Sequence, residues 1–351
     1  MLTFPAARLC AIGQQIFLAS GAPPDIAGRV ATALVDANLA GHDSHGVQHI
    51  PNYVRSVQDG LIVPDARPEA VRESPTTALV AGRWGFGHVA AEAATRIAIA
   101  KAQAQDVAVV GLVECNHIGR LGEYATMAAE AGVVALIAAG GFAEPPSKAQ
   151  VVPFGGRQRA LGTNPLAVGF PGGELPPPFL DFATSAIAAG KIALARSKGE
   201  ALPPGCILDE EGRPSTDPED YDRGGMLLPF GGHKGYALAV AVELLGRVLT
   251  GADAYASEQR GGPTFAHSGT CILAVRADVF QPGQRFGETV DATLRRLKEV
   301  PPAPGVPEVL FPGEPEWRTR AARLRDGIPL PESTWAAIQE TASSVGLTSL
   351  A

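Results

Sequence analysis

The chain has 351 residues, 46% of them hydrophobic, and a formal net charge of −7, which allows one large domain or several smaller ones with a sizeable core. Because the acidic balance comes without a basic cluster and no 18-residue apolar run occurs, we expect neither a nucleic-acid partner nor a membrane span. The four cysteines are far apart and form no CxxC pair, and residues 1–5 do not resemble a signal peptide, so we expect a cytoplasmic protein without a disulfide scaffold or a zinc ribbon.

The first part of the chain, residues 1–60, is predicted to be helical. One helix is expected to be capped by Asp25, since apolar residues follow Asp25 at helical spacing. The next helix is expected to open in a histidine-rich segment, with Asp43 or Ser44 as its cap. Pro51 lies inside this second helix, so we expect the helix either to be kinked or to begin one turn later.

From about residue 76 strands alternate with helices, which predicts an α/β fold. The predicted strands cover 77–81, 107–113, 133–138, 166–170, 179–182 and 270–275. The predicted helices cover 90–104, 121–131 and 235–249, then 317–325 and 332–344 after a stiff Pro-rich linker at 301–307. We therefore predict a helical domain at 1–75, an α/β domain at 76–285, and a helical part at 286–351 that packs with the first domain.

Three histidines and a tyrosine lie close together between residues 42 and 53. If this segment is helical from its start, His45, His49 and Tyr53 stand at positions i, i+4 and i+8 and share one face. Two imidazoles and a phenol on one face supply proton donors and acceptors near neutral pH. The pattern therefore predicts a site that handles protons.

A glycine motif, Gly85-Phe86-Gly87-His88-Val89-Ala90, fits the dinucleotide fingerprint G-x-G-x-x-A between a predicted strand and a predicted helix. That fingerprint also requires an acidic residue at the end of the second strand. The nearest candidate, Asp106, precedes that strand. The glycines are therefore open to two interpretations, a cofactor loop or only a tight strand-to-helix turn.

Polar loops follow several predicted strands, at the positions where ligands usually bind in α/β proteins. His117 and Arg120 follow the strand at 107–113, although a loop histidine can also serve only to bond the backbone. The loops Gly162–Pro165 and Asp181–Ser185 carry small hydroxyl and amide side chains, which suit ribose and phosphate as well as ordinary turns.

A further glycine-rich segment, Pro229–Tyr236, precedes a strongly apolar helix. It brings together a tight turn, Lys234 and a helix N-terminus, which in physical terms is an anion site. The alternative is a loop with a solvated lysine.

A metal site is a competing interpretation of the histidine segment. His45 and His49 have the spacing of two zinc ligands, but Gly46 stands where a zinc protease carries glutamate, and no third ligand is near. We therefore predict no metal, and keep a metal-dependent hydrolase or lyase that uses His42, Asp43, His45 and His49 as the competing enzyme class. A binding protein that has lost its chemistry is the third class.

The motifs occur in an order that resembles the type 2 malate/L-lactate dehydrogenase family. The resemblance is carried by Ser44–Val47 with Tyr53, Asn116–Gly119, Gly162–Pro165, Asp181–Ser185, Gly232–Tyr236 and Phe311–Glu314. It covers the chain from about residue 5 to residue 345. Members of that family include ureidoglycolate, sulfolactate and diketogulonate dehydrogenases or reductases, and cyclic-imine reductases.

The resemblance implies an α/β, non-Rossmann domain that binds NAD or NADP, in a homodimer with its active site near the subunit contact. It implies hydride transfer between nicotinamide and C2 of a small 2-hydroxy or 2-oxo acid, with a cyclic-imine carboxylate as the alternative substrate. It also implies that His45 and His117 are the catalytic histidines. The cofactor-binding residues it implies are Asp181, Phe182, Ala183, Thr184, Ser185, His233, Lys234, Gly235, Gly313 and Glu314.

One position departs from the family pattern. Four residues after His45 the family commonly carries an arginine that holds the substrate carboxylate, and here that position is His49, which offers fewer donors to one carboxylate. Arg55 or Arg120 is the alternative holder of the carboxylate. The predicted substrate-binding residues are Ser44, His49, Tyr53, Arg120 and Thr163.

The general acid/base is left open between His45 and His117. A helix N-terminus disfavours the cationic form of a nearby imidazole. This favours a neutral His45 and assigns the change of charge to His117.

Overall fold

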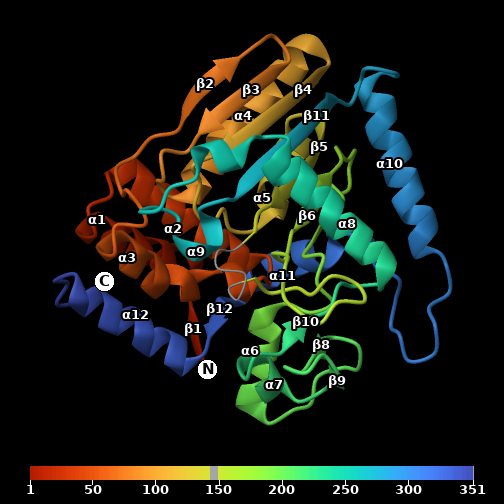
Figure 1. The fold of residues 1–351 in the computed structure, drawn as a ribbon. Coiled ribbons are helices and arrows are strands. Elements are labelled where there is room, and N and C mark those ends of the chain that lie inside the picture. The colour runs from red at the N-terminus through yellow and green to blue at the C-terminus, as the bar shows by residue number, and fades with distance from the viewer. Residues whose placement is uncertain (143–148, 351) are drawn as a thin grey trace.

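A central sheet of seven strands forms the middle of the molecule (Figure 1). The computed structural model describes residues 1–142 and 149–350. Across the sheet the strands are β2 (Glu69–Glu73), β3 (Thr77–Ala81), β4 (Val107–Val113), β11 (Gly269–Arg276), β5 (Val133–Gly140), β6 (Leu166–Gly169) and β7 (Phe179–Phe182). Among the described pairs only β3 and β4 run parallel. The fold is therefore mixed α/β, and each of the predicted strands is present.

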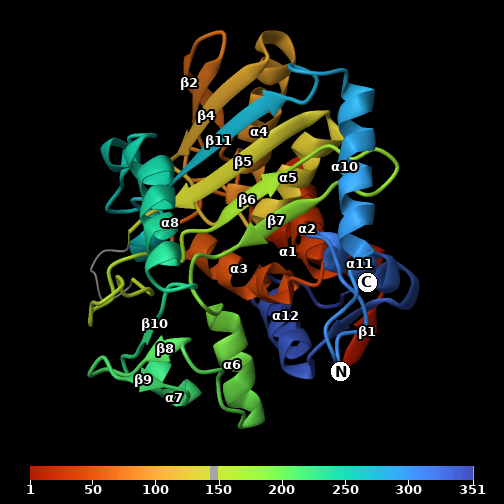
Figure 2. The same ribbon diagram turned by 90° about the vertical axis from the view of Figure 1, so that its right-hand side faces the viewer.

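Helices pack on both faces of this sheet (Figure 2). On one face, α4 (Gly87–Gln105) and α5 (Leu121–Glu130) join β4 and β5 in a buried apolar cluster. On the other face lies α8 (His233–Glu243), whose backbone approaches Gly140 so closely that a side chain at Gly140 would overlap it. Burial on both faces explains why the sequences of β4 and β5 are continuous apolar runs. No helix in the described ranges is long and apolar enough to cross a membrane.

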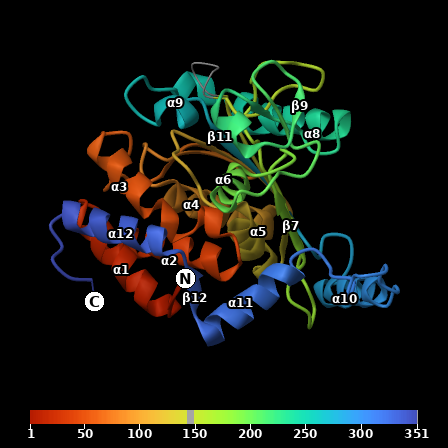
Figure 3. The same ribbon diagram turned by 90° about the horizontal axis from the view of Figure 1, so that it is seen from below.

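The two ends of the chain lie together (Figure 3). Strand β1 (Leu2–Phe4) pairs antiparallel with β12 (Ile328–Leu330). Residues of these two strands belong to a second buried apolar cluster. The helices that contribute to this cluster are α1 (Ala6–Ala19), α2 (Pro24–Leu39), α3 (Ile50–Gln58) and α12 (Glu332–Ser344). Helix α11 (Glu314–Asp326) contacts α2 from outside this cluster. The domain boundaries themselves stay predictions.

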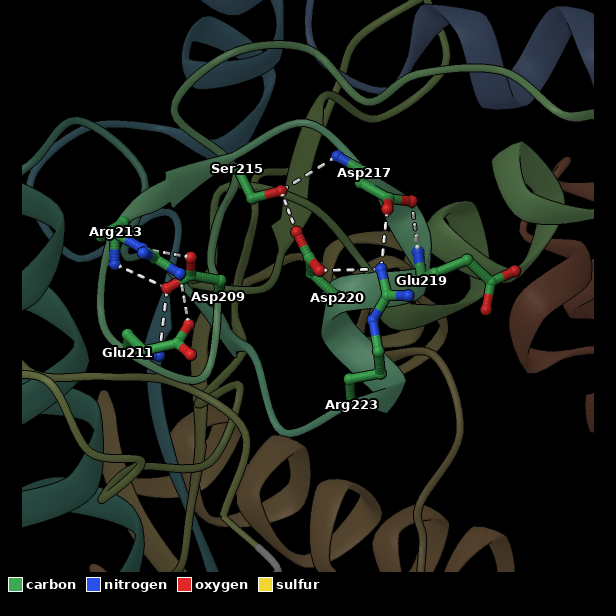
Figure 4. A network of polar contacts seen from close by, with 8 residues as sticks. All are labelled: Asp209, Glu211, Arg213, Ser215, Asp217, Glu219, Asp220 and Arg223. Carbon is green, nitrogen blue, oxygen red and sulfur yellow. Dashed lines mark hydrogen bonds and ion pairs between the residues drawn. The ribbon is translucent and has the colours of Figure 1, made fainter.

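A small lobe lies below the sheet in the views of Figures 1 and 2. It contains α6 (Ala189–Lys198), β8 (Ile207–Leu208), β9 (Pro214–Ser215), α7 (Pro218–Asp222) and β10 (Met226–Leu227). On its surface Arg213 bonds to Asp209 and Glu211, and Arg223 bonds to Asp217 and Asp220 (Figure 4). Because these pairs are largely exposed, they contribute little to stability, and the small apolar core of the lobe carries its packing.

Helix α10 (Gly283–Lys298) stands along the outside of the molecule (Figure 2). Its buried Asp291 accepts hydrogen bonds from the backbone of Gly173, Glu174 and Leu175 at 2.7–3.2 Å. This helix was not predicted, and the predicted boundary between the α/β domain and the C-terminal helical part, at 285/286, falls inside α10.

The structure corrects several helix boundaries. Asp25 does not cap α2, because the helix begins at Pro24 and Asp25 lies in its first turn, bonded to Arg67. Helix α4 begins at Gly87, three residues earlier than predicted, because the glycine motif itself forms its start. Helix α8 begins at His233 and ends at Glu243, where the chain continues as a π-turn (Leu244–Val248).

Candidate active site

The histidine segment is not one helix. It forms two 3-10 turns, Asp43–His45 and Val47–His49, and α3 begins only at Ile50. Pro51 lies in the first turn of α3, where a proline costs no backbone hydrogen bond. The later of the two predicted helix starts is therefore correct, and neither Asp43 nor Ser44 caps the helix.

The side chains of this segment nevertheless gather at one place, together with His117 from the loop after β4. The ring centroids of His45 and His117 are 5.6 Å apart, and those of His49 and His117 are 5.1 Å apart. The Tyr53 ring stacks on His49 at 5.4 Å. The fold thus joins residues that are 64 positions apart in the chain, as Tyr53 and His117 are.

Tyr53 and His117 share a hydrogen bond of 2.6 Å between the phenol oxygen and Nδ1. Burial raises the pKa of Tyr53, so the phenol stays neutral. Burial also lowers the pKa of His117 well below its ordinary value, and the imidazoles of His49 and His45 add to this effect. A neutral His117 whose Nδ1 is fixed by Tyr53 leaves Nε2 as the nitrogen available to a ligand.

His45 and His49 are held by Ser44. The Ser44 hydroxyl lies 3.0 Å from His45 Nδ1, and His49 Nε2 donates a hydrogen bond of 2.7 Å to the Ser44 carbonyl. Burial, reinforced by the neighbouring His49, lowers the pKa of His45 to about 4. Burial also lowers the pKa of His49, although the Ser44 carbonyl opposes the shift. The imidazoles of His45, His49 and His117 are therefore uncharged at neutral pH.

Asn38, at the end of α2, fixes the shape of the histidine segment. Its side chain is 1% exposed, donates to Asp43 at 2.6 Å and accepts from the backbone of Val47 at 2.8 Å. A Cβ at Gly46 would overlap the Asn38 amide group, so any larger residue there would have to displace the Asn38 side chain. Arg323 of α11 adds two hydrogen bonds to Asp43, at 2.6 and 3.0 Å. Sequence reasoning missed Asn38, because nothing local distinguishes it from a surface asparagine.

A cavity of about 190 Å³ opens beside Tyr53 and His117. Its wall is formed by α3, by the start of α4, by the loop after β4 and by α9 (Gly262–Phe265), and Phe265 packs on His117 at 5.8 Å. The volume corresponds to roughly six water molecules at about 30 Å³ each, which is the size class of a small carboxylic acid. Asn116 braces the wall by donating to the carbonyls of Leu61, Trp84 and Gly85.

The two arginines predicted to hold a carboxylate do not line this cavity. Arg55 is exposed on α3. Arg120 is 7% exposed, bonds to Asp36 at 3.0 Å and lies over the Phe179 ring, where it lines a separate charged cleft. Thr163 lies in another loop, where its carbonyl accepts both the N–H and the hydroxyl of Thr184.

The predicted cofactor segments 181–185 and 233–235 are neighbours. The backbone at Ser185 bridges to Pro229, Phe230 donates to the Thr184 carbonyl, and the ring of Phe182 packs on Phe230. His233 and Lys234 are exposed in the first turn of α8, after two glycines with positive φ. The Asp181 carboxylate instead points at α5, where it accepts the Gly122 N–H at 2.7 Å, and burial raises its pKa.

The chain that follows the segment 181–185 approaches the histidine segment at the start of α6. Gly190, in the first turn of α6, lies so near Ser44 that a Cβ on Gly190 would be 3.2 Å from the Ser44 Cβ. By contrast, the Glu314 carboxylate is occupied by Lys298, Arg318 and the Phe311 N–H, which gives it an evident structural role. Gly313 packs against Phe179 with a positive φ.

The predicted groups therefore divide into a histidine–tyrosine cluster and a glycine-rich loop pair at the start of α8. Within the cluster Tyr53 and His117 line the cavity, whereas His45 and His49 are not among its lining residues. Within the described ranges no group of three or more His, Cys, Asp or Glu side chains has the arrangement of a metal site. His88, from the glycine motif, also lines the cavity, and it was not among the predicted site residues.

Known proteins are similar to this chain over nearly its whole length. A family model described as malate/L-lactate dehydrogenase matches residues 4–339. Hydroxycarboxylate dehydrogenase B of Escherichia coli strain K12 is 38% identical over 98% of this chain and 94% of its own. The structure of malate dehydrogenase from Entamoeba histolytica superposes with a TM-score of 0.91 at 28% identity, over 99% of both chains.

A third similar protein is named as a reductase rather than as a dehydrogenase. The structure of delta1-piperideine-2-carboxylate reductase from Pseudomonas syringae pvar. tomato superposes with a TM-score of 0.84 at 32% identity, over 97% of this chain and 100% of its own. The family model and the identities together establish the family. This chain belongs to the malate/L-lactate dehydrogenase family.

Proposed function

We propose that this protein transfers a hydride between NAD or NADP and C2 of a small 2-hydroxy or 2-oxo acid. As a member of its family it is an oxidoreductase that acts on CH–OH groups. The observation that carries the finer proposal is the hydrogen bond between Tyr53 and His117 at the wall of a cavity of small-acid size.

His117 is proposed as the general acid/base, with His45 as the alternative. When Nδ1 of His117 carries the shared proton and donates it to the Tyr53 oxygen, Nε2 presents a lone pair that can take the hydroxyl proton of a 2-hydroxy acid. The low pKa of His117 keeps this lone pair free at neutral pH. In the direction of reduction the same nitrogen returns the proton to the substrate oxygen.

The start of α8 and the segment 181–185 are proposed to hold the cofactor. Lys234 is exposed there, and the turn before the helix, at Gly231 and Gly232, has no side chains to obstruct a phosphate. The residues present therefore fit a dinucleotide phosphate. The nicotinamide, when bound, supplies or accepts the hydride, and the protein's part is to orient it and to move one proton.

A cyclic-imine carboxylate is the second candidate substrate. It is favoured by the structural similarity to delta1-piperideine-2-carboxylate reductase. The same general acid would protonate an imine nitrogen in place of a carbonyl oxygen.

We also propose a cytoplasmic homodimer whose contact lies near the active site. The π-helical turn after α8 carries Leu244 and Val248 and is followed by Leu249, each more than half exposed. This segment precedes α9, which lines the cavity. An exposed apolar patch of this kind is typical of a contact between proteins. A second copy of the chain would cover it.

The experiment that tests the function is an absorbance screen at the band of the reduced nicotinamide. Both cofactors are combined with a panel of 2-oxo acids, 2-hydroxy acids and cyclic imines. Turnover of a 2-oxo or 2-hydroxy acid is expected. Turnover of cyclic imines alone would support the second candidate, and no turnover with either cofactor would contradict the proposal.

A further inference from the structure

The glycine motif at 85–90 forms the start of helix α4, and this start lies on the wall of the cavity. Gly87 and His88 are the first two residues of the helix, and both line the cavity. The first turn uses the Phe86 carbonyl for Val89 and Ala90, while the N–H groups of Gly87 and His88 have no acceptor among the described residues. Free N–H groups and the helix dipole give such an end a partial positive charge.

His88 adds a side chain without hydrogen-bond partners among the described residues at the same point, although its ring contacts that of Tyr53 at 5.6 Å. It is 1% exposed, and its Nδ1 is buried without a hydrogen bond. Its Nε2 also forms no hydrogen bond with the described residues, and it lies against Gly119, where a Cβ would be 2.5 Å away. Buried polar atoms without a partner are uncommon, and they often indicate a missing ligand or water.

The rest of the cavity offers little else to an anion. No Lys, Arg, Asp or Glu is found among the described lining residues. The Asn116 amide is occupied by three carbonyls, and the Tyr53 phenol by His117. Apart from His117, the remaining polar side chains are the hydroxyls of Ser56 and Thr264. A carboxylate in this cavity would therefore meet its strongest donors at the start of α4.

We propose that the start of α4 is the carboxylate-binding part of the substrate cavity, with the backbone N–H groups of Gly87 and His88 and the imidazole of His88 as donors. This inference rests on the proposed function, in which the substrate carries a carboxylate beside C2. It gives the glycine motif a role other than binding a dinucleotide. It also replaces an arginine with neutral donors, which fits the absence of a cation in the described wall.

Gly87 explains how the carboxylate site and the acid/base come to be adjacent. A side chain at Gly87 would overlap the carbonyl oxygens of Asn116 and His117, so only glycine lets the helix start press against the His117 backbone. The ring of His88 is 6.3 Å from that of His117. A carboxylate bound at the start of α4 therefore leaves the adjacent C2 atom on the His117 side of the cavity.

The test measures binding without hydride transfer, with oxamate as an unreactive 2-oxo acid analogue and oxamide as its uncharged counterpart. Titration calorimetry is carried out on the full-length protein with reduced cofactor present. Wild type is expected to bind oxamate at least about 10-fold more tightly than oxamide. His88→Phe is expected to lose about 10-fold in affinity for oxamate and little for oxamide, while His88→Asn, which keeps a donor, retains more. Arg223→Ala, on the small lobe, is the control that should change neither.

A second measurement needs no variant and covers the case in which His88→Phe fails to fold. In a ¹⁵N spectrum of the wild type, oxamate is expected to shift the amide protons of Gly87 and His88 downfield. Unshifted amides, equal binding of the two compounds, or unchanged oxamate binding by folded His88→Phe would each overturn the inference. Carboxylate binding that depends on His88 without any nicotinamide-linked turnover would leave the inference standing and contradict the proposed function instead.

Discussion

Replacing Tyr53 by phenylalanine removes one hydrogen bond and keeps the ring packing of the cluster. The lost bond is the 2.6 Å contact to His117 Nδ1, while the stacking of the ring on His49 stays possible. His117 then has a buried nitrogen without a partner, which costs about 1–3 kcal/mol. If the free energy of the reactive orientation of His117 rises by this amount, hydride transfer slows by roughly 5- to 150-fold.

The assay for Tyr53→Phe is single-turnover hydride transfer, followed by absorbance over a range of pH. The matched control is Tyr124→Phe, which removes another buried phenol, bonded to the Ile118 carbonyl at 2.5 Å, outside the cavity wall. Both variants should lose similar thermal stability, and only Tyr53→Phe should slow transfer and move the pH profile. Equal rates in the two variants would refute the argument that Tyr53 orients His117.

Three further predictions concern the acid/base, the cofactor and the subunit contact. Oxidation of a hydroxy acid needs neutral His117, and because the pKa of His117 is lowered, the rate of oxidation should stay high from pH 8 to below pH 6.5 and fall only at lower pH. Reduction needs protonated His117, so its rate should fall as the pH rises. Parallel pH profiles for the two directions would contradict this. Lys234→Ala should raise the KM for the cofactor more than the KM for the substrate, and steady-state kinetics showing the reverse would move Lys234 to the substrate side. Leu244→Glu should place a charge in the exposed apolar patch and shift the protein to a monomer in light scattering, so an unchanged mass would argue against the proposed contact.

Six of the seven strands of the sheet could be predicted from the sequence, because they are short, largely apolar runs. The edge strand β2 was missed, because its residues are mostly charged and all exposed. The run 107–113 became β4 without a change of boundary. Helix α10 was also within reach, since Phe286, Val290 and Leu294 recur at helical spacing, although most of its other side chains are exposed. The pairing of β1 with β12 could not be predicted, because it depends on segments more than 300 positions apart.

Candidate site residues could be chosen from the sequence, but their arrangement could not. The presumed helical face of His45, His49 and Tyr53 does bring these side chains together, although through 3-10 turns held by Asn38 rather than through one helix. That shape depends on tertiary hydrogen bonds, which local spacing does not encode. For the same reason Arg120 could not be placed, since its partner Asp36 lies on α2.

The glycine motif shows what a local pattern leaves open. Its spacing fits a dinucleotide loop, and it does lie between a strand and a helix. What the spacing cannot reveal is the neighbour: Gly87 meets the backbone of the loop that carries His117. The function of such a turn is set by the segment packed against it.

The central claim is that an imidazole of this cluster moves the substrate proton, and single-turnover hydride transfer by His117→Ala and His45→Ala tests it most directly. Loss of a positioned acid/base is expected to slow transfer by about 10² to 10⁴-fold. We predict that His117→Ala falls in this range at neutral pH while still binding cofactor. Near-wild-type transfer by both variants would contradict the account.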